Sequence, residues 1–358
     1  MGYEVDFLAV GEGEKSGDAI ALRFGNLYGK RSEQMVVVID GGYQESGKAL
    51  VEHIKYCYDT DVVDLVVSTH PDRDHASGLS VVLNELKVGT LWMHQPWKHS
   101  YAMSHLFKDG RVTDNSIRSS IKDALNAVYE LEQIAQRKRI KVVEPFCGLT
   151  DDSEHLVVLS PTRKFYKKLL PDFRCTPEPR KDTIGNFSSF VRTVEESWNH
   201  ETLREDGETS AENDSSVILL LKHDNRNLLF TADAGISALT EAVNYLEYNN
   251  FDFSMLNFIQ IPHHGSRRNV SPSILNRLLG HPKSGRLASF MNHKDAFVSA
   301  SIHGVPKHPS KKVTNAFHRR GYQVHTTQGI NKLHRHNAPD RRGWTSSIPE
   351  VFHINIEE

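Results

Sequence analysis

The chain has 358 residues, with 43 Lys or Arg against 45 Asp or Glu, and a formal net charge of −2. Hydrophobic residues make up 38% of it, which allows a sizeable core and excludes a globally disordered chain. The longest apolar runs have five residues, far short of the ~20 needed to cross a membrane. The three cysteines form no CxxC pair, and no basic and apolar leader is evident, so we expect a cytoplasmic protein without disulfides.

The near-neutral charge averages two unlike parts of the chain. Residues 263–345 hold 15 Lys or Arg, only two acids (Asp295 and Asp340) and 10 of the 20 histidines. The remainder carries 28 basic and 43 acidic residues, so an acidic body is joined to a basic, histidine-rich end. This segregation predicts either a surface for a polyanion or a docking face for an acidic partner.

The first part of the chain predicts a β-rich unit with helices between its strands. Apolar alternation and continuous apolar runs indicate strands at Tyr3–Val10, Asp18–Phe24, Met35–Asp40, Val62–Thr69, Thr90–His94, Lys141–Val143 and Leu156–Leu159. Apolar positions spaced by three and four indicate helices at Gly47–Tyr58, Leu79–Leu86 and Asp114–Arg139.

From Pro161 to Asp214 this periodicity fails, over a stretch that is first basic and then acidic. We expect an insertion at 161–214 that is partly mobile or contacts a partner. Strands are predicted after it at Ser216–Lys222, Asn227–Thr231, Met255–Ile261, Ala296–Ser301 and Gln323–Thr326, and helices at Ile236–Tyr248, Ser271–Leu279 and Ser310–Arg320. The order predicts one α/β domain over residues 1–358, an αββα sandwich of two sheets between helices.

Four potential metal ligands follow the predicted strand that ends at residue 69. They are His70, Asp72, Asp74 and His75, within six residues. Alternation along an extended loop would place the first three on one side and His75 on the other, which suits two adjacent ions. A polar loop that caps the next helix through Asp74 or Ser77 is the alternative.

This segment, His-Pro-Asp-Arg-Asp-His, resembles the HxHxDH signature of the metallo-β-lactamase fold, in the HxDxDH variant of ComEC-type proteins. These are bacterial competence proteins whose soluble hydrolase domain degrades one DNA strand. Further landmarks similar to that branch follow the same order: Val10–Gly13 with Asp18–Ile20, Val36–Gly42, Asp214–Val217, Thr231–Asp233, Pro262–Ser266 and Lys307–Ser310. The resemblance implies a stand-alone, metallo-β-lactamase-like hydrolase, and its relatives in bacterial anti-phage systems suggest antiviral defence by analogy.

The later landmarks add candidate ligands. Asp233 ends an apolar strand, where the resemblance implies an acid that bridges two cations and a helix cap is the alternative. His263 and His264 are adjacent, so we expect them to point opposite ways, one to metal and one to substrate as a general acid. His308 is a further expected ligand, with a surface loop as the alternative, and Asp40 is expected to orient a ligand from behind.

Two departures from the common signature affect the expected metals. Asp72 replaces its second histidine, and no His-Gly-His or Gly-His-Thr element lies between Leu79 and Thr231. Both departures also occur in the ComEC-type branch. A ligand set rich in oxygen as well as nitrogen predicts two divalent ions, zinc or manganese. The remaining histidines of this part are expected to lie on the surface or in the core: His94, His99, His105, His155, His200 and His223.

A metal pair bridged by a carboxylate activates water near neutral pH and neutralises charge on a phosphoryl oxygen. Asp74 is expected to orient this water, and His263 or His264 to protonate the leaving oxygen. Five cations beside these motifs are expected to bind substrate phosphates: Arg267, Arg268, Lys307, Lys311 and Lys312. Further cations are expected to extend this positive region: Arg319, Arg320, Lys332, Arg335, Arg341 and Arg342.

The sequence therefore predicts a metal-dependent phosphodiesterase, a nuclease that cleaves DNA or RNA by metal-activated hydroxide. One alternative is a hydrolase of a small phosphoester or cyclic nucleotide. Another is a non-catalytic subunit of a defence-type complex that binds a protein partner through 161–214. Nucleic acid is thus the expected partner, with no membrane and an oligomer left open.

Overall fold

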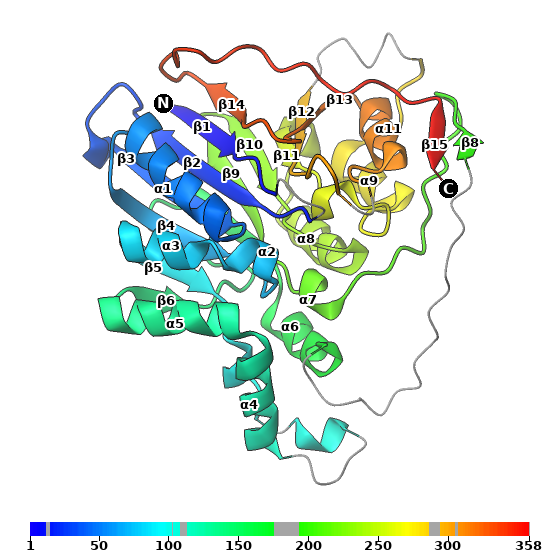
Figure 1. The fold of residues 1–358 in the computed structure, drawn as a ribbon. Helices are drawn as coiled ribbons and strands as arrows, with labels where there is room; N and C mark the ends of the chain where they lie inside the picture. The colour runs from blue at the N-terminus through cyan, green and yellow to red at the C-terminus, as the bar shows by residue number, and fades with distance from the viewer. Residues whose placement is uncertain are drawn as a thin grey trace.

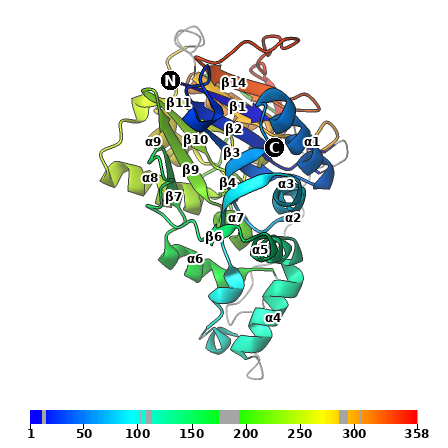
Figure 2. The same ribbon diagram turned by 90° about the vertical axis from the view of Figure 1, so that its left-hand side faces the viewer.

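The computed structural model describes residues 1–11, 15–101, 103–107, 113–174, 193–285, 294–304 and 307–357. Two β-sheets lie face to face at its centre, and helices cover both outer faces (Figure 1). Figure 2 shows the same arrangement, with two sheets between two sets of helices, in a view turned by 90°. This order confirms the αββα sandwich predicted from the sequence.

The first sheet has seven strands, in the order β14-β1-β2-β3-β4-β5-β6. Their bounds are β1 Gly2–Phe7, β2 Ala19–Gly25, β3 Gln34–Gly41, β4 Val62–Ser68, β5 Lys87–Met93, β6 Lys141–Val143 and β14 Lys332–His336. Helices α1 (Gln44–Cys57), α3 (Leu79–Glu85) and α5 (Asn126–Lys138) cover its outer face. Strands β3 to β6 are parallel, so their carboxyl ends share one edge.

The second sheet has six strands, in the order β13-β12-β11-β10-β9-β7. Their bounds are β7 Leu156–Ser160, β9 Ile218–His223, β10 Arg226–Phe230, β11 Leu256–Gln260, β12 Lys294–Val298 and β13 Tyr322–Thr326. Helices α8 (Ile236–Tyr248), α9 (Pro272–Leu279) and α11 (Lys311–Arg319) cover its outer face.

The core consists of three apolar layers, one between the sheets and one beneath each set of helices. Strand β9 shows how the period of two distributes side chains, because Leu219 and Leu221 enter the central layer while Leu220 faces the helices. Phe258 and Phe297 meet edge-on in the central layer, with ring centroids 5.2 Å apart. Burial on both faces explains why these strands are continuous apolar runs.

The predicted helix Asp114–Arg139 is two helices, α4 (Asp114–Ala124) and α5, so its single-helix prediction was wrong. Leu125, between them, has φ −99° and ψ 38°, outside the helical region. Apolar periodicity continues across the break because Ile121, Leu125 and Val128 are all buried. Helix α4 therefore leaves the sheet and extends from the body (Figure 1).

The described part of 161–214 contains α6 (Arg163–Leu169), β8 (Thr193–Glu195) and α7 (Ala211–Asp214). Strand β8 pairs with β15 (Asn355–Glu357) near the end of the chain. Residues 175–192, which belong to the stretch predicted to be partly mobile or to contact a partner, lie outside the described residues. None of the described helices is both long and apolar enough to cross a membrane.

Two buried cations of the basic end are paired with acids from the insertion. Arg319 and Arg320 on and after α11 are buried, 1% and 2% exposed. Glu196 lies 3.4 Å from Arg319, and Glu201 lies 2.9 Å from Arg320. Both acids come from the acidic half of 161–214. The charges that are segregated along the sequence therefore meet in space.

Candidate metal centre

Asp233 lies just beyond β10, among four histidines. Its Oδ1 is 3.4 Å from Nε2 of His75 and 3.8 Å from Nε2 of His264. Its Oδ2 is 3.6 Å from Nε2 of His263 and 3.8 Å from Nε2 of His70. Five of the predicted site residues are thus brought together from three loops, one after β4 of the first sheet and two after the neighbouring strands β10 and β11 of the second.

The opposite ring nitrogens are held by neighbouring groups. Nδ1 of His75 lies 2.8 Å from Asp40, and Nδ1 of His264 lies 3.0 Å from the carbonyl oxygen of Ser299. Asp40 also accepts hydrogen bonds from the backbone and hydroxyl of Thr69. With Nδ1 occupied, each ring presents Nε2 to the centre, which is how partners behind a metal ligand orient it. Asp40 therefore has the position predicted for it.

The atoms at the centre suit divalent metal ions. Nε2 of His70, His75 and His264 and Oδ1 of Asp233 are buried and have no hydrogen-bond partner. A buried polar atom without a partner costs ~1–3 kcal/mol, so four together require a compensating group. Nitrogen and carboxylate donors of this kind bind zinc or manganese. Among the described residues, three groups have ligand atoms within 4.8 Å of one another: Asp40, His70 and His75; Asp74, His75 and His264; Asp18, His75 and Asp233.

The buried carboxylates and imidazoles at the centre shift one another's pKa values. Burial alone would lower the pKa of His75, but the Asp233 and Asp40 carboxylates hold it well above its ordinary value. Burial lowers the pKa of His264 to about 3. Burial would raise the pKa of Asp233, but the surrounding histidines, with His263 the largest contributor, hold it well below the ordinary value. The carboxylates here thus stabilise a cation, and metal ions compete with protons for the same atoms.

Asp18 is a site residue that the sequence reasoning missed. Its Oδ2 lies 3.7 Å from Nδ1 of His75 and accepts a hydrogen bond of 2.8 Å from Gln260. Burial, together with the Asp233 and Asp40 carboxylates, raises the pKa of Asp18 to about 7. The signal was present in the sequence, because Asp18 belongs to one of the landmark motifs, but no role was inferred for it.

Four non-glycine residues at the centre have left-handed backbone conformations. The φ angles are 55° at Asp40, 46° at Ala232, 47° at His263 and 55° at His264. Such strain costs ~1–3 kcal/mol per residue and concentrates at functional sites. The left-handed conformations of His263 and His264 also correct the expectation that these two side chains point opposite ways. That expectation assumed extended backbone, whereas these two conformations turn both Nε2 atoms to Asp233.

The loop after β4 differs in a similar way from the extended form assumed for it. Residues Arg73–Ala76 form a helical turn, α2, so strict alternation does not apply. His70 and His75 lie on the same side, with ring centroids 4.2 Å apart. Asp72 turns outward, and both its oxygens bind Nη2 of Arg174, at 2.6 and 2.9 Å. Asp72 belongs to none of the three ligand groups above, and Arg174 occupies its carboxylate instead.

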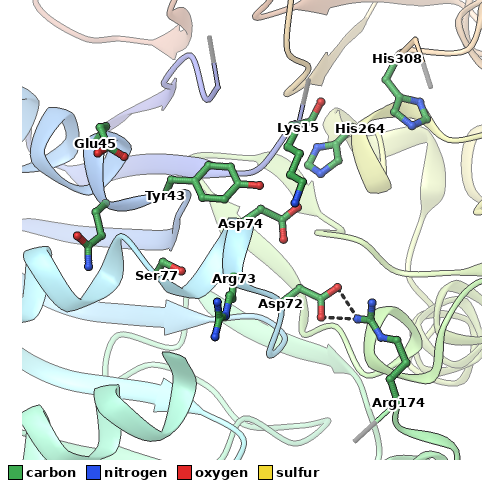
Figure 3. Close-up of a pocket in the computed structure, with 12 residues that line it drawn as sticks. Lys15, Tyr43, Glu45, Asp72, Arg73, Asp74, Ser77, Arg174, His264 and His308 are labelled. Atoms are coloured by element: carbon green, nitrogen blue, oxygen red, sulfur yellow. Dashed lines mark hydrogen bonds and ion pairs between the residues drawn. The ribbon is translucent and has the colours of Figure 1, made fainter. Parts of the chain in front are cut away.

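A pocket of about 700 Å³ lies over the centre. Asp74, His264 and His308 form part of its wall, and the Tyr43 side chain extends toward Asp74 and His264 (Figure 3). The His308 ring lies near that of His263, with centroids 6.4 Å apart. The charged residues that line the pocket also include Lys15, Glu45, Asp72, Arg73 and Arg174. The site is therefore an open, polar pocket above buried ligands.

The cations that line this pocket are not the five predicted from the sequence. Its basic residues are Lys15, Arg73 and Arg174, whereas none of the predicted set lines it: Arg267, Arg268, Lys307, Lys311 and Lys312. Adjacency to a motif does not set side-chain direction. Lys312 is buried on α11, and Lys311 donates to the Asn355 carbonyl 3.1 Å away.

No protein-family model and no curated protein matches the chain. Among solved structures it is similar to unliganded yeast PDE1, at 12% identity over 92% of this chain and 98% of that one, with a TM-score of 0.44. It is also similar to a diphosphatase from the PhnP family (8% identity, 94% and 98% covered, TM-score 0.38) and to a metallo-β-lactamase from Hirschia baltica (14%, 78% and 99%, 0.33). Likenesses this distant carry no argument about chemistry, which is drawn from the site itself.

Proposed function

We propose that the protein is a metal-dependent hydrolase of phosphate esters. The observation that carries this proposal is the convergence of buried, unsatisfied Nε2 atoms of His70, His75 and His264 on Asp233. Partners behind the rings fix these atoms in place, so the ligand set is built before any ion binds. Bound divalent ions would act there as Lewis acids and lower the pKa of water.

Residues around the pocket can perform the remaining steps. Asp74 groups with His75 and His264 and lines the pocket, where it can orient the attacking water. The His263 side chain, 29% exposed, is the more accessible of the adjacent pair and can protonate the leaving oxygen. Burial raises the pKa of Tyr43 to about 12, so its phenol stays neutral and can donate to a phosphoryl oxygen.

The charge distribution favours a small phosphoester over a long nucleic acid. The nuclease prediction rested on five cations expected beside the site, but none of the five lines the pocket. Three cations expected to extend that region, Arg319, Arg320 and Arg341, are ion-paired within the protein. In the pocket, three cations are matched by Glu45, Asp72 and Asp74. Such a site can bind one or two phosphoryl groups, while a polyanion needs a continuous row of cations. We therefore place the small phosphoester first and the nuclease second.

The test measures metal content and hydrolysis together. Protein treated with chelator and reloaded with zinc or manganese is analysed by elemental mass spectrometry and assayed on bis(p-nitrophenyl) phosphate. Asp233→Asn should lose metal and about 100-fold in activity, because the amide replaces one carboxylate oxygen and removes the negative charge that the four histidines surround. The exposed Asp152→Asn serves as the matched control. Equal metal content and equal rates in both variants would remove the proposed centre.

Two rival functions have distinct outcomes in the same experiment. Cleavage of DNA or RNA that falls steeply with salt, without cleavage of small esters, would favour the nuclease. Wild-type protein that binds no metal would favour a non-catalytic subunit. For such a subunit, the insertion at 161–214 remains the proposed contact with a protein partner.

A further inference from the structure

A second pocket, of about 540 Å³, adjoins the one over the metal centre. Gln44, Arg73 and Ser77 line both pockets, so the two hollows are adjacent. Side by side, they make up a groove of two compartments between Asp74 at the metal centre and residues of helix α5. Each compartment has the size of a small-molecule site, and one phosphate ester group does not fill both.

The two compartments differ in charge. The first contains three cations and three acids above the metal ligands. Of the described residues that line the second, two are charged: Arg73, at the junction, and Glu130 on α5. Apart from Ala127, its other lining residues are polar and uncharged, including Asn126, Tyr129 and Gln133. The first compartment therefore suits an anion, and the second suits a neutral group that forms hydrogen bonds.

The polar groups of the second compartment are available to a ligand. Asn126 uses its amide oxygen to accept a 2.8 Å hydrogen bond from Arg73, which leaves its NH₂ group as a donor. The side chains of Glu130 and Gln133 are exposed and have no hydrogen-bond or ion-pair partner within the part of the chain that the structure describes. They offer a carboxylate acceptor and an amide with both donor and acceptor.

Tyr129 forms a fixed part of the wall. Its ring meets Trp97 edge-on at 5.1 Å, and the Lys122 ammonium lies 4.6 Å from its centroid. The contact with Trp97 connects the compartment floor to the core, because Trp97 is buried. The compartment is thus shaped by residues that are themselves held in place.

We propose that this second compartment binds the nucleoside part of a nucleotide phosphoester whose phosphate lies at the metal centre; this inference rests on the proposed function. A nucleoside is neutral and carries the ribose hydroxyls and base edges that amide and carboxylate groups recognise. Glu130 accepts from a hydroxyl or ring N–H, and it repels a second phosphate. The groove therefore selects a nucleotide-sized ester over a polyanion.

Two chromogenic substrates with the same leaving group test the inference. Bis(p-nitrophenyl) phosphate has no nucleoside, whereas the p-nitrophenyl ester of thymidine 5′-phosphate has one. Gln133→Ala should raise KM for the thymidine ester by roughly three- to tenfold, the loss expected for a hydrogen bond, and leave KM for the simple ester unchanged. Gln136→Ala, exposed on the same helix but not part of the pocket lining, is the matched control and should change neither.

A binding measurement gives a readout that does not depend on turnover. By calorimetry on chelator-treated protein, thymidine 5′-phosphate should bind more tightly than inorganic phosphate, and Gln133→Ala should remove most of the difference. Equal affinities for the two ligands, or equal losses on both substrates, would overturn the nucleoside site while hydrolysis of the simple ester still supports the proposed function. Wild-type protein inactive on both substrates would instead remove the proposed function.

Discussion

Replacement of Arg341 by alanine tests whether this arginine stabilises the fold or binds a substrate. The Arg341 side chain is 9% exposed and lies 2.5 Å from Asp6 and 2.9 Å from Glu4, both 0% exposed. Sequence reasoning counted this arginine in a positive surface region. The structure instead assigns it to a buried ion cluster, so Arg341→Ala should act mainly on stability.

The magnitude follows from the two carboxylates that lose a partner. Removing one member of a buried ion pair costs ~3–5 kcal/mol. Glu4 keeps Arg23 at 2.5 Å and Asp6 keeps His53 at 3.2 Å, so the lower end, ~3 kcal/mol, applies. With an unfolding entropy of ~2.1 cal/mol/K per residue over 358 residues, this loss lowers Tm by about 4 °C.

The assay measures Tm by thermal unfolding and DNA affinity by titration with single-stranded DNA, for Arg341→Ala and for a control variant. Arg335→Ala is the control, because it removes the same charge from an exposed pair with Asp340 and should lower Tm by no more than ~1 °C. Arg341→Ala should melt ~4 °C below wild type, with any DNA affinity unchanged. If Arg341→Ala had the same Tm as wild type but bound DNA more weakly, Arg341 would be a surface cation. That result would support the nuclease prediction.

Three further changes test the centre and its surroundings. Asp40→Asn, which weakens the hold on Nδ1 of His75, should reduce metal affinity ~10–100-fold, measured by competition with a chromophoric chelator. Arg174→Met, which frees Asp72, should tighten metal binding by up to about fivefold by calorimetry, and weaker binding would contradict competition between the two. Burial would raise the pKa of Asp295, but hydrogen bonds from two histidines hold it below the ordinary 3.8. Its contribution to stability is thus present above pH 3.8 and lost as pH falls below it, so the Tm difference between wild type and Asp295→Asn should narrow there.

Local patterns predicted most elements but not all of their ends. Helix Ile236–Tyr248 has the bounds that its periodicity predicted. Strand β14, Lys332–His336, was missed because its composition is polar and its stability comes from pairing with β1, more than 300 residues earlier in the chain. The sequence shows no local signal for a partner at that distance.

The metal centre was more predictable than the pocket above it. His70 and Asp233 were found because each directly follows a predicted strand and belongs to a landmark motif, and the structure brings them together from loops of the two sheets. The pocket cations depend instead on side-chain direction and on distant segments. Arg174 reaches Asp72 across 102 positions, and no spacing rule connects them. His94, for which surface and core were both left open, lies in the core, where it stacks on Tyr166 with centroids 4.3 Å apart.

The pairing of acids and bases from opposite ends of the chain also affects how the protein is made. During synthesis the acidic body emerges before the basic segment, and Glu4, Asp6, Glu196 and Glu201 have no cationic partner from α11 or the residues after it until that segment has been made. Electrostatic attraction then draws α11 and the basic residues after it toward these acids, and salt weakens this attraction by screening it. Docking of the last helix and strand is therefore the step of folding most sensitive to ionic strength.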